Sequence, residues 1–205
     1  MTYVFLHGLG QTAASWVRVR SALALNEPAA CPELASLMGD GPHTYTALSD
    51  SFAAYCEAIS GPLRLCGLSL GGVLALEYTI SHPEKIQSLV LIGTPYIMPK
   101  RLLQAQNAVF RLMPKRAFAA TGFQKNDFIQ LCTSMMDLDF RDGLGTLTCP
   151  ALVVCGERDR ANRKAAAELA KQLPAGKFRI IEGAGHEVNT EAPEALAGVL
   201  RAFWN

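Results

Sequence analysis

The stretch Cys66-Gly67-Leu68-Ser69-Leu70-Gly71-Gly72 decides how this chain folds. It follows the apolar run 63–65 and precedes the helix-like run 73–78, so Ser69 stands between a predicted strand and a predicted helix. A serine at such a tip has strained backbone, and side chains two residues to either side of it would collide with the neighbouring strand and helix. Glycines occupy both of those positions. The pattern G-x-S-x-G therefore predicts a serine hydroxyl held clear of a sheet.

Three further segments end predicted strands. Near the N-terminus, the run Tyr3-Val4-Phe5-Leu6 leads into the turn His7-Gly8-Leu9-Gly10. Near the C-terminus, the run 151–155 ends in Gly156-Glu157-Arg158-Asp159, and the run 178–181 leads to Glu182-Gly183-Ala184-Gly185-His186. The chain order is serine, then acid, then histidine, each at the carboxyl end of a predicted strand.

The order of elements predicts the fold class. Short, continuous apolar runs bounded by glycine or proline are typical of strands buried on both faces of a parallel sheet. They occur at 3–6, 63–66, 88–92, 151–155 and 178–181, with a short sixth strand expected near 29–31 between two prolines. Helical patterns lie between them at 13–25, 48–59, 73–80, 163–172 and 193–203. The alternation predicts an α/β fold with a doubly wound, mostly parallel sheet of about six strands flanked by helices.

With these motifs the sequence resembles the α/β-hydrolase superfamily, in particular its serine esterase and lipase-like members. The resemblance rests on the His7-Gly8 turn, the segment around Ser69, the helix exit His82-Pro83-Glu84 before 89–93, the strand end 156–159, and Gly185-His186. That fold usually begins with two strands for which this chain has no residues. We therefore expect a shortened fold that lacks the first two strands, in one domain of residues 1–205, with a small helical cap inserted at 94–147.

The resemblance implies a role for each site residue. Ser69 would be the nucleophile, His186 the general base and Asp159 the acid that orients it, while the backbone N–H groups of Leu9 and Leu70 would form an oxyanion hole. Glu157 is the nearest rival for the acid, and the G-x-x-D spacing favours Asp159. Gln11 follows the turn closely enough to contact a substrate.

The expected cap carries two patterns whose meaning stays open. Apolar residues at helical spacing either pack the cap onto the body or line an acyl pocket. They are Leu102, Val109, Phe110 and Met113, then Phe128, Leu131, Cys132, Met135 and Met136. The basic residues Lys100, Arg101, Arg111, Lys115, Arg116 and Lys125 form either a solvated face or a docking patch for a phosphate-bearing carrier, such as an acyl carrier protein or coenzyme A.

The function expected from this resemblance is hydrolysis of a small to medium carboxylic ester or thioester through an acyl-enzyme on Ser69. Two alternatives remain. The first is a lyase or synthase like the menaquinone synthase, although those relatives carry an arginine four residues after the serine where this chain has Val73. The second is a catalytically weak ligand-binding receptor. Fold alone does not select among them.

Composition and net charge limit the classes of partner that this protein is expected to bind. The chain has 205 residues, half of them hydrophobic, and a net charge of +1, which argues against nucleic acid as a partner and favours small molecules. No apolar run approaches a membrane span, and the N-terminus does not resemble a signal peptide. The six cysteines form no C-x-x-C pair and are expected to be free thiols, mostly in the core, so we expect a cytoplasmic location. The motifs imply no metal and no cofactor, and they leave the oligomeric state open.

Overall fold

A six-stranded, fully parallel sheet forms the centre of the computed structural model, which describes residues 1–39 and 41–205. Its strands are β1 (Thr2–Leu6), β2 (Ala29–Ala30), β3 (Leu63–Leu68), β4 (Ile86–Ile92), β5 (Ala151–Gly156) and β6 (Gly176–Ile181). Their order across the sheet is β2-β1-β3-β4-β5-β6. The expected doubly wound parallel sheet is confirmed, and β2 is the short edge strand that its flanking prolines predict.

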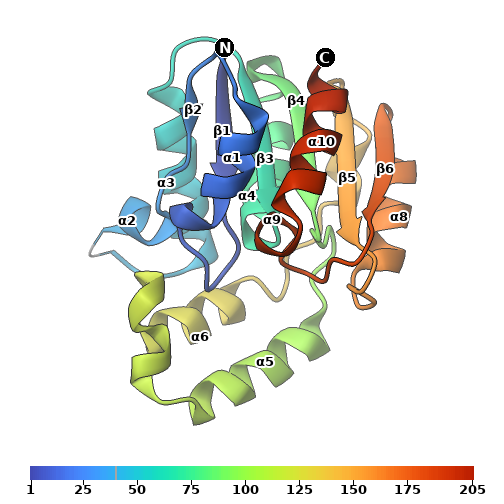
Figure 1. Cartoon of the computed structure of the whole chain (residues 1–205). Coiled ribbons are helices and arrows are strands. Elements are labelled where there is room, and N and C mark those ends of the chain that lie inside the picture. Colours follow the sequence, from blue (N-terminus) through green and yellow to red (C-terminus); the bar gives the residue numbers. More distant parts are fainter. Residues whose placement is uncertain (40) are drawn as a thin grey trace.

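The helices lie on both faces of this sheet (Figure 1). One face carries η1 (Ala13–Trp16), α1 (Val17–Leu23), α9 (Val188–Glu191) and α10 (Pro193–Trp204). The other carries α2 (Leu34–Met38), α3 (Tyr45–Glu57), α4 (Leu70–Ser81) and α8 (Arg163–Gln172), and η2 (Pro83–Lys85) follows α4. The helix expected over 13–25 is in fact a 3-10 turn followed by α1, which ends where Ala24 adopts a left-handed conformation at φ 49°.

Each strand sends alternate side chains into two separate cores. Val4, Leu65 and Val153 point to the α3, α4 and α8 side, whereas Phe5, Leu68 and Val154 point to the α1 and α10 side. Alternation of this kind within continuous apolar strands is the signature of a sheet covered on both faces. The cysteines are free, and all except the half-buried Cys31 lie in the core, as expected.

The strand order reverses at the centre of the sheet, between β1 and β3. The chain passes from β1 outward to β2 and then returns to β3 on the opposite side of β1, so the direction of winding reverses between β1 and β3. Outside the carboxyl ends of strands at such a reversal, the connecting loops diverge and leave a crevice. The turn 7–10 leaves β1 and Ser69 leaves β3 at this point.

Residues 94–147 lie below the carboxyl ends of the strands in Figure 1 and contain α5 (Lys100–Leu112), η3 (Lys115–Thr121), α6 (Lys125–Ser134) and α7 (Arg141–Leu144). A cluster of aromatic rings in edge-to-face contact joins α5, η3 and α6. Its members are Phe110, Phe118, Phe123 and Phe128. An antiparallel bridge between Ile97 and Asp139 holds the two ends of this segment together. The segment is therefore a small packed unit, and α6 contacts the body again where Tyr45 N of α3 donates to Ser134 Oγ.

Candidate active site

Ser69 occupies a sharp turn between β3 and α4. Its backbone has φ 51° and ψ −114°, a combination that non-glycine residues rarely adopt. Two hydrogen bonds fix this strained residue, because its N–H donates to Ile92 O at 2.8 Å and its carbonyl accepts from Val73 N at 2.9 Å. The surrounding structure therefore determines the conformation, as strained functional residues require.

The neighbouring glycines are there because side chains would not fit. A Cβ at Gly67 would overlap the carbonyl of Gly71 in α4, and a Cβ at Gly71 would overlap the carbonyl of Leu6 in β1. Both clashes are with backbone, which cannot move aside as a flexible side chain can. The steric requirement predicted from the G-x-S-x-G pattern is confirmed at both positions.

Asp159 and His186 meet beyond the carboxyl ends of β5 and β6. His186 Nδ1 lies 2.7 Å from Asp159 Oδ2. A carboxylate only accepts hydrogen bonds, so Nδ1 carries the proton and Nε2 is the nitrogen left free. The Asp159 side chain is 5% exposed and that of His186 is 41% exposed. Gly93 makes room for the ring, because a Cβ there would lie 2.9 Å from His186 Cε1.

The Asp159 carboxyl group stays ionised despite its burial. Desolvation raises its pKa, but hydrogen bonds from His186 and Asn162 outweigh that effect and hold the pKa below its usual range. Glu157, the rival acid, points elsewhere, since its Oε2 accepts from Gly183 N at 2.9 Å. Of the two carboxylates, Asp159 is the one that contacts the imidazole.

Asn162 is a residue of this site that the sequence analysis missed. Its Nδ2 donates to Asp159 Oδ1 at 3.0 Å and to Oδ2 at 2.9 Å. The available signal was its place just before α8, but an asparagine there predicts a helix cap. The side chain makes no capping hydrogen bond and reaches back to Asp159 instead.

The side chain of His7 hydrogen-bonds the turn that follows β1. Its Nδ1 hydrogen-bonds Gly8 O at 2.9 Å while its Nε2 accepts from Leu34 N at 3.2 Å, so the ring is neutral with its proton on Nδ1. Burial lowers the pKa of His7 and favours this neutral form. His7 therefore links the turn to the start of α2.

The sequence suggested that Gln11 contacts a substrate, but its side chain does not line the site. It is buried and exchanges two amide hydrogen bonds with Asn189, from Gln11 Nε2 to Asn189 Oδ1 at 3.2 Å and from Asn189 Nδ2 to Gln11 Oε1 at 3.1 Å. The expectation that it contacts a substrate is wrong. Gly8 N also donates to Gln11 Oε1 at 3.3 Å, so Gln11 ties the turn after β1 to α9.

A cavity of about 550 Å³ brings the predicted site residues together. Ser69, Asp159, His186, Leu9 and Leu70 all line it. Leu70 is the first residue of α4, whose N–H has no partner within the helix, and donors of this kind suit an anionic oxygen. The remaining wall is mainly apolar and includes Val73, Met98, Leu102, Val109, Cys132 and Met135, with Gln106 and Asn162 as its polar members.

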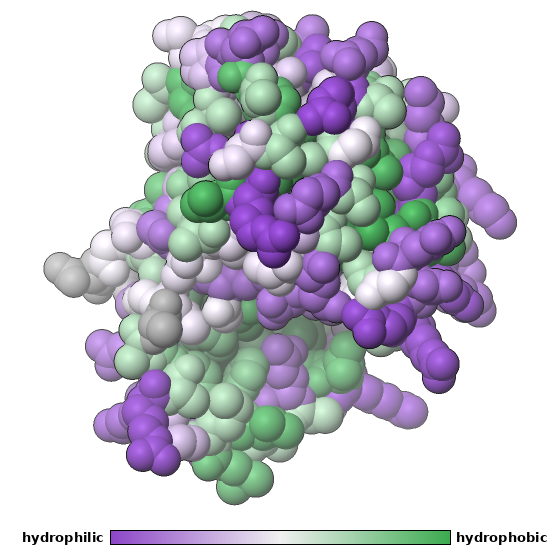
Figure 2. Space-filling view, viewed as in Figure 1, coloured by the Kyte–Doolittle hydropathy of each residue, from purple (hydrophilic) through white to green (hydrophobic). Residues whose placement is uncertain are grey.

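Part of this apolar wall belongs to α5. Leu102 is 52% exposed and Val109 is 56% exposed, although both face the cavity, so the cavity is open to solvent along this helix. Figure 2 shows apolar residues gathered on the lower part of the molecule, where Figure 1 has α5. Of the apolar residues predicted on the two cap patterns, Leu102, Val109, Cys132 and Met135 line the cavity. Phe110, Phe128 and Leu131 pack instead.

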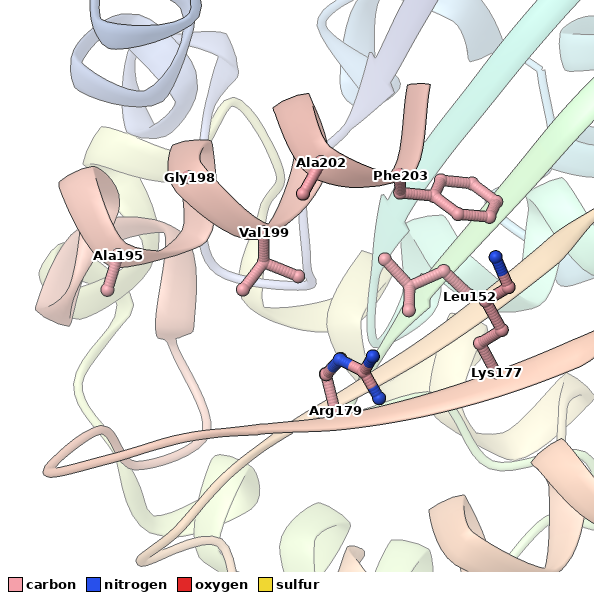
Figure 3. A pocket seen from close by; sticks show the side chains of 8 residues that line it. All are labelled: Leu152, Lys177, Arg179, Ala195, Gly198, Val199, Ala202 and Phe203. Carbon is pink, nitrogen blue, oxygen red and sulfur yellow. The ribbon is translucent and has the colours of Figure 1, made fainter. Parts of the chain in front are cut away.

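A second hollow, of about 320 Å³, lies away from this site between β6 and α10 (Figure 3). Lys177 and Arg179 of β6 face Val199 and Phe203 of α10 across it, with Lys177 Nζ 6.0 Å from the centre of the Phe203 ring. Cationic side chains on an edge strand discourage pairing with another chain.

Across residues 1–39 and 41–205, no three His, Cys, Asp or Glu side chains gather as ligands for a metal ion. No helix in the same ranges has both the length and the apolar character of a membrane span.

Known proteins resemble this chain over most of its length. The pimeloyl-(acyl-carrier protein) methyl ester esterase of Aeromonas hydrophila is 26% identical over 98% of this chain and 94% of its own. A Bacillus subtilis protein named for 2-succinyl-6-hydroxy-2,4-cyclohexadiene-1-carboxylate synthase activity is 25% identical over 82% of this chain and 75% of its own. The enol-lactonase structure from Burkholderia xenovorans superposes with a TM-score of 0.83 at 19% identity, covering 99% of this chain and 90% of that one. The model of the alpha/beta hydrolase family matches residues 3–199, and this chain therefore belongs to that family.

Proposed function

We propose that this protein is a serine hydrolase that cleaves a small to medium carboxylic ester or thioester through an acyl-enzyme on Ser69. One observation carries the proposal: a serine on a strained turn shares a cavity with a histidine whose Nδ1 is bound to a buried carboxylate. Family membership supports the hydrolase class. Four of the relatives that match are named as pimeloyl-(acyl-carrier protein) methyl ester esterases, which supports an ester as the substrate.

In the proposed mechanism Ser69 Oγ attacks the acyl carbon while His186 Nε2 takes the hydroxyl proton. The imidazolium that forms is stabilised by the Asp159 carboxylate on its other nitrogen. The same proton then goes to the leaving alcohol or thiol as the bond to the acyl carbon breaks. Water then attacks the acyl-enzyme and gives one proton to His186, which passes it to Ser69 Oγ as the bond from that oxygen to the acyl carbon breaks and the carboxylic acid leaves.

The backbone N–H groups of Leu70 and Leu9 are the proposed donors to the carbonyl oxygen as it gains negative charge. Leu70 N stands at the N-terminus of α4, where the helix dipole adds positive potential. His7 and Gln11 both hydrogen-bond Gly8, the residue before Leu9, at its carbonyl and at its N–H. One such donor contributes about 10²–10³ in rate.

Residues 94–147 are proposed as a cap whose α5 lines the acyl pocket. Leu102 and Val109 are seven residues apart on α5 and both face the cavity, so they span about 10 Å along the helix. An extended acyl chain of about eight carbons has that length. We infer a preference for medium chains, with the chain lying along α5.

This pocket gives a prediction about chain length. Val109→Trp fills the far end of the pocket, so kcat/KM for a p-nitrophenyl octanoate should fall about tenfold while that for the acetate stays unchanged. Leu112→Trp is the matched control, because Leu112 lies on the same helix but is 87% exposed and outside the cavity. Equal losses on the two esters would place the acyl chain elsewhere.

An acyl-carrier conjugate is the proposed form of the natural substrate. The basic patch of the cap is smaller than its sequence suggested, because Lys100 pairs with Asp137 at 2.6 Å and Lys125 donates to the last carbonyls of α5. Arg101, Arg111, Lys115 and Arg116 are exposed, and no described carboxylate pairs with them. The last three lie close together in sequence, at the end of α5 and the start of η3, and are the cations proposed to meet a carrier's phosphate or acidic residues.

Reversing these three charges to glutamate should lower kcat/KM for a carrier-linked acyl ester at least tenfold, mainly through slower association, and the loss should shrink at high salt. Turnover of a neutral p-nitrophenyl ester should not change. Reversing Lys171 of α8 together with Lys177 and Arg179 of β6 makes the same change in net charge outside residues 94–147 and serves as the control. If the cap triple lowers both substrates equally, the patch does not dock a carrier.

The Bacillus subtilis relative supports the lyase alternative. Its chemistry needs a cation for an anionic substrate, yet Val73 occupies the position of the expected arginine, and no lysine or arginine lines the cavity within the described residues. A receptor would not need the hydrogen-bonded acid and base. Ester hydrolysis is therefore the function we propose.

The test is hydrolysis of a p-nitrophenyl ester series from acetate to palmitate, with wild type and Ser69→Ala in parallel. Hydrolysis that peaks at medium chains and disappears in the variant supports the proposal. A folded wild type that cleaves none of the series would contradict it and favour the lyase or receptor.

A further inference from the structure

We propose that Asn162 is a positioning residue that fixes the Asp159 carboxylate, and through it the imidazole of His186. The proposal rests on the proposed function for the role of that pair. Asn162 Nδ2 lies 3.0 Å from Oδ1 and 2.9 Å from Oδ2, so one amide group straddles both oxygens of the carboxylate. Asn162 also lines the cavity, beside the acid and the base.

The carboxylate depends on this side chain for its hydrogen bonds. Among the described residues, both donors to Oδ1 belong to Asn162, since its backbone N–H also approaches that oxygen at 3.4 Å. Oδ2 receives His186 Nδ1 and the same amide. A buried carboxylate oxygen without a donor is costly, and hydrogen bonds to an ionised group are strong. Without the Asn162 side chain, Oδ1 would keep only the 3.4 Å contact from the backbone N–H of residue 162, and the carboxylate would be free to rotate.

Asn162 acts on the histidine through Asp159. Its Nδ2 lies 3.3 Å from His186 Nδ1, but that nitrogen already donates its proton to Asp159 and so cannot accept from the amide. The effect on the ring is therefore indirect: the amide sets the direction of Oδ2, and Oδ2 sets the orientation and tautomer of the imidazole. Hydrogen bonds from His186 and Asn162 keep the pKa of Asp159 low against the opposing effect of burial.

The local backbone explains why this asparagine is available. Arg163 N donates to Asp159 O at 3.1 Å and Ala166 N donates to Asn162 O at 2.8 Å, so the turn from Asp159 into α8 is fixed without the side chain. Asn162 makes no side-chain capping hydrogen bond. Among the described residues, Asp159 is the only side chain that accepts a hydrogen bond from the Asn162 amide, which points to a role in the site rather than in the helix.

A double-mutant cycle tests this role. Asn162→Leu keeps the size and removes the donors, so kcat for a p-nitrophenyl ester should fall about 10- to 100-fold with KM unchanged. In an Asp159→Asn background the same change should cost less than about twofold, because residues that act as a unit are not additive. An equal loss in both backgrounds, or a loss that appears in KM alone, would overturn the proposal.

Two controls separate positioning from folding. Arg160→Leu alters an exposed residue of the same turn outside the cavity and should leave kcat and Tm unchanged. Asn162→Asp keeps the shape but places a second carboxylate beside Asp159, so it should lose at least as much kcat as Asn162→Leu. If Asn162→Leu does not fold, Asn162→Asp decides the question by the same cycle.

A substrate-independent measurement keeps this inference apart from the proposed function. The Nδ1 proton of His186, in a short hydrogen bond to a carboxylate, should give a downfield proton resonance in the wild type. It should move upfield or disappear in Asn162→Leu and persist in Arg160→Leu. A resonance unchanged in Asn162→Leu would refute the positioning role even if no ester is cleaved, and a lost resonance would support that role whatever the substrate.

Discussion

Ser69→Ala should lower kcat for ester hydrolysis by about 10⁶-fold. The reason is that the variant has no oxygen to form the acyl-enzyme, and the free nitrogen of His186 has no hydroxyl to deprotonate. What remains is the cavity and the proposed oxyanion donors, which accelerate attack by water only weakly. The measurement is kcat for the best p-nitrophenyl ester, with active-site labelling by a fluorophosphonate as a second readout.

Stability provides the control for this variant. Alanine at φ 51° is as strained as serine, so Ser69→Ala should unfold at nearly the wild-type Tm. Ser69→Gly relieves the strain and should unfold at a higher temperature while it is equally inactive. A variant that keeps the wild-type rate would show that the hydrolysis comes from a contaminant or from another nucleophile.

The sequence predicts this part of the site because its causes are local. Gly67 and Gly71 are required by backbone contacts within one strand–turn–helix unit, so the pattern alone carries the geometry. The parallel sheet follows for a similar reason, since each apolar run is short and continuous. The meeting of Asp159 and His186 also follows, because parallel strands end at one edge of the sheet.

Other features depend on contacts that no local pattern contains. Gln11 and Asn189 are 178 residues apart in sequence, and either amide alone is compatible with a surface position. Asn162 reads as a helix cap until the Asp159 carboxylate is placed beside it. On α5, both faces carry apolar residues. Only the tertiary arrangement decides that Val109 faces the cavity while Phe110 packs against Phe118.

Asp159→Asn should lower kcat by about 10⁴-fold. An asparagine there can turn its N–H₂ toward His186, in which case the ring proton moves to Nε2 and that nitrogen no longer accepts from Ser69. Substrate binding does not involve Asp159 directly, so KM should stay within about twofold while kcat falls. The expected loss is smaller than for Ser69→Ala because the proposed nucleophile and the proposed oxyanion donors remain.

Glu157→Gln is the matched control, since both residues follow β5 and both changes replace a carboxylate by an amide. Glu157 Oε2 accepts from Gly183 N, and a glutamine oxygen can keep that bond, so kcat should stay within about twofold of the wild type. The opposite pattern, in which Glu157→Gln loses activity and Asp159→Asn keeps it, would assign the acid to Glu157. It would also require the turn 157–162 to rearrange on substrate binding. Among the described residues, Asp159 is the only carboxylate that contacts His186.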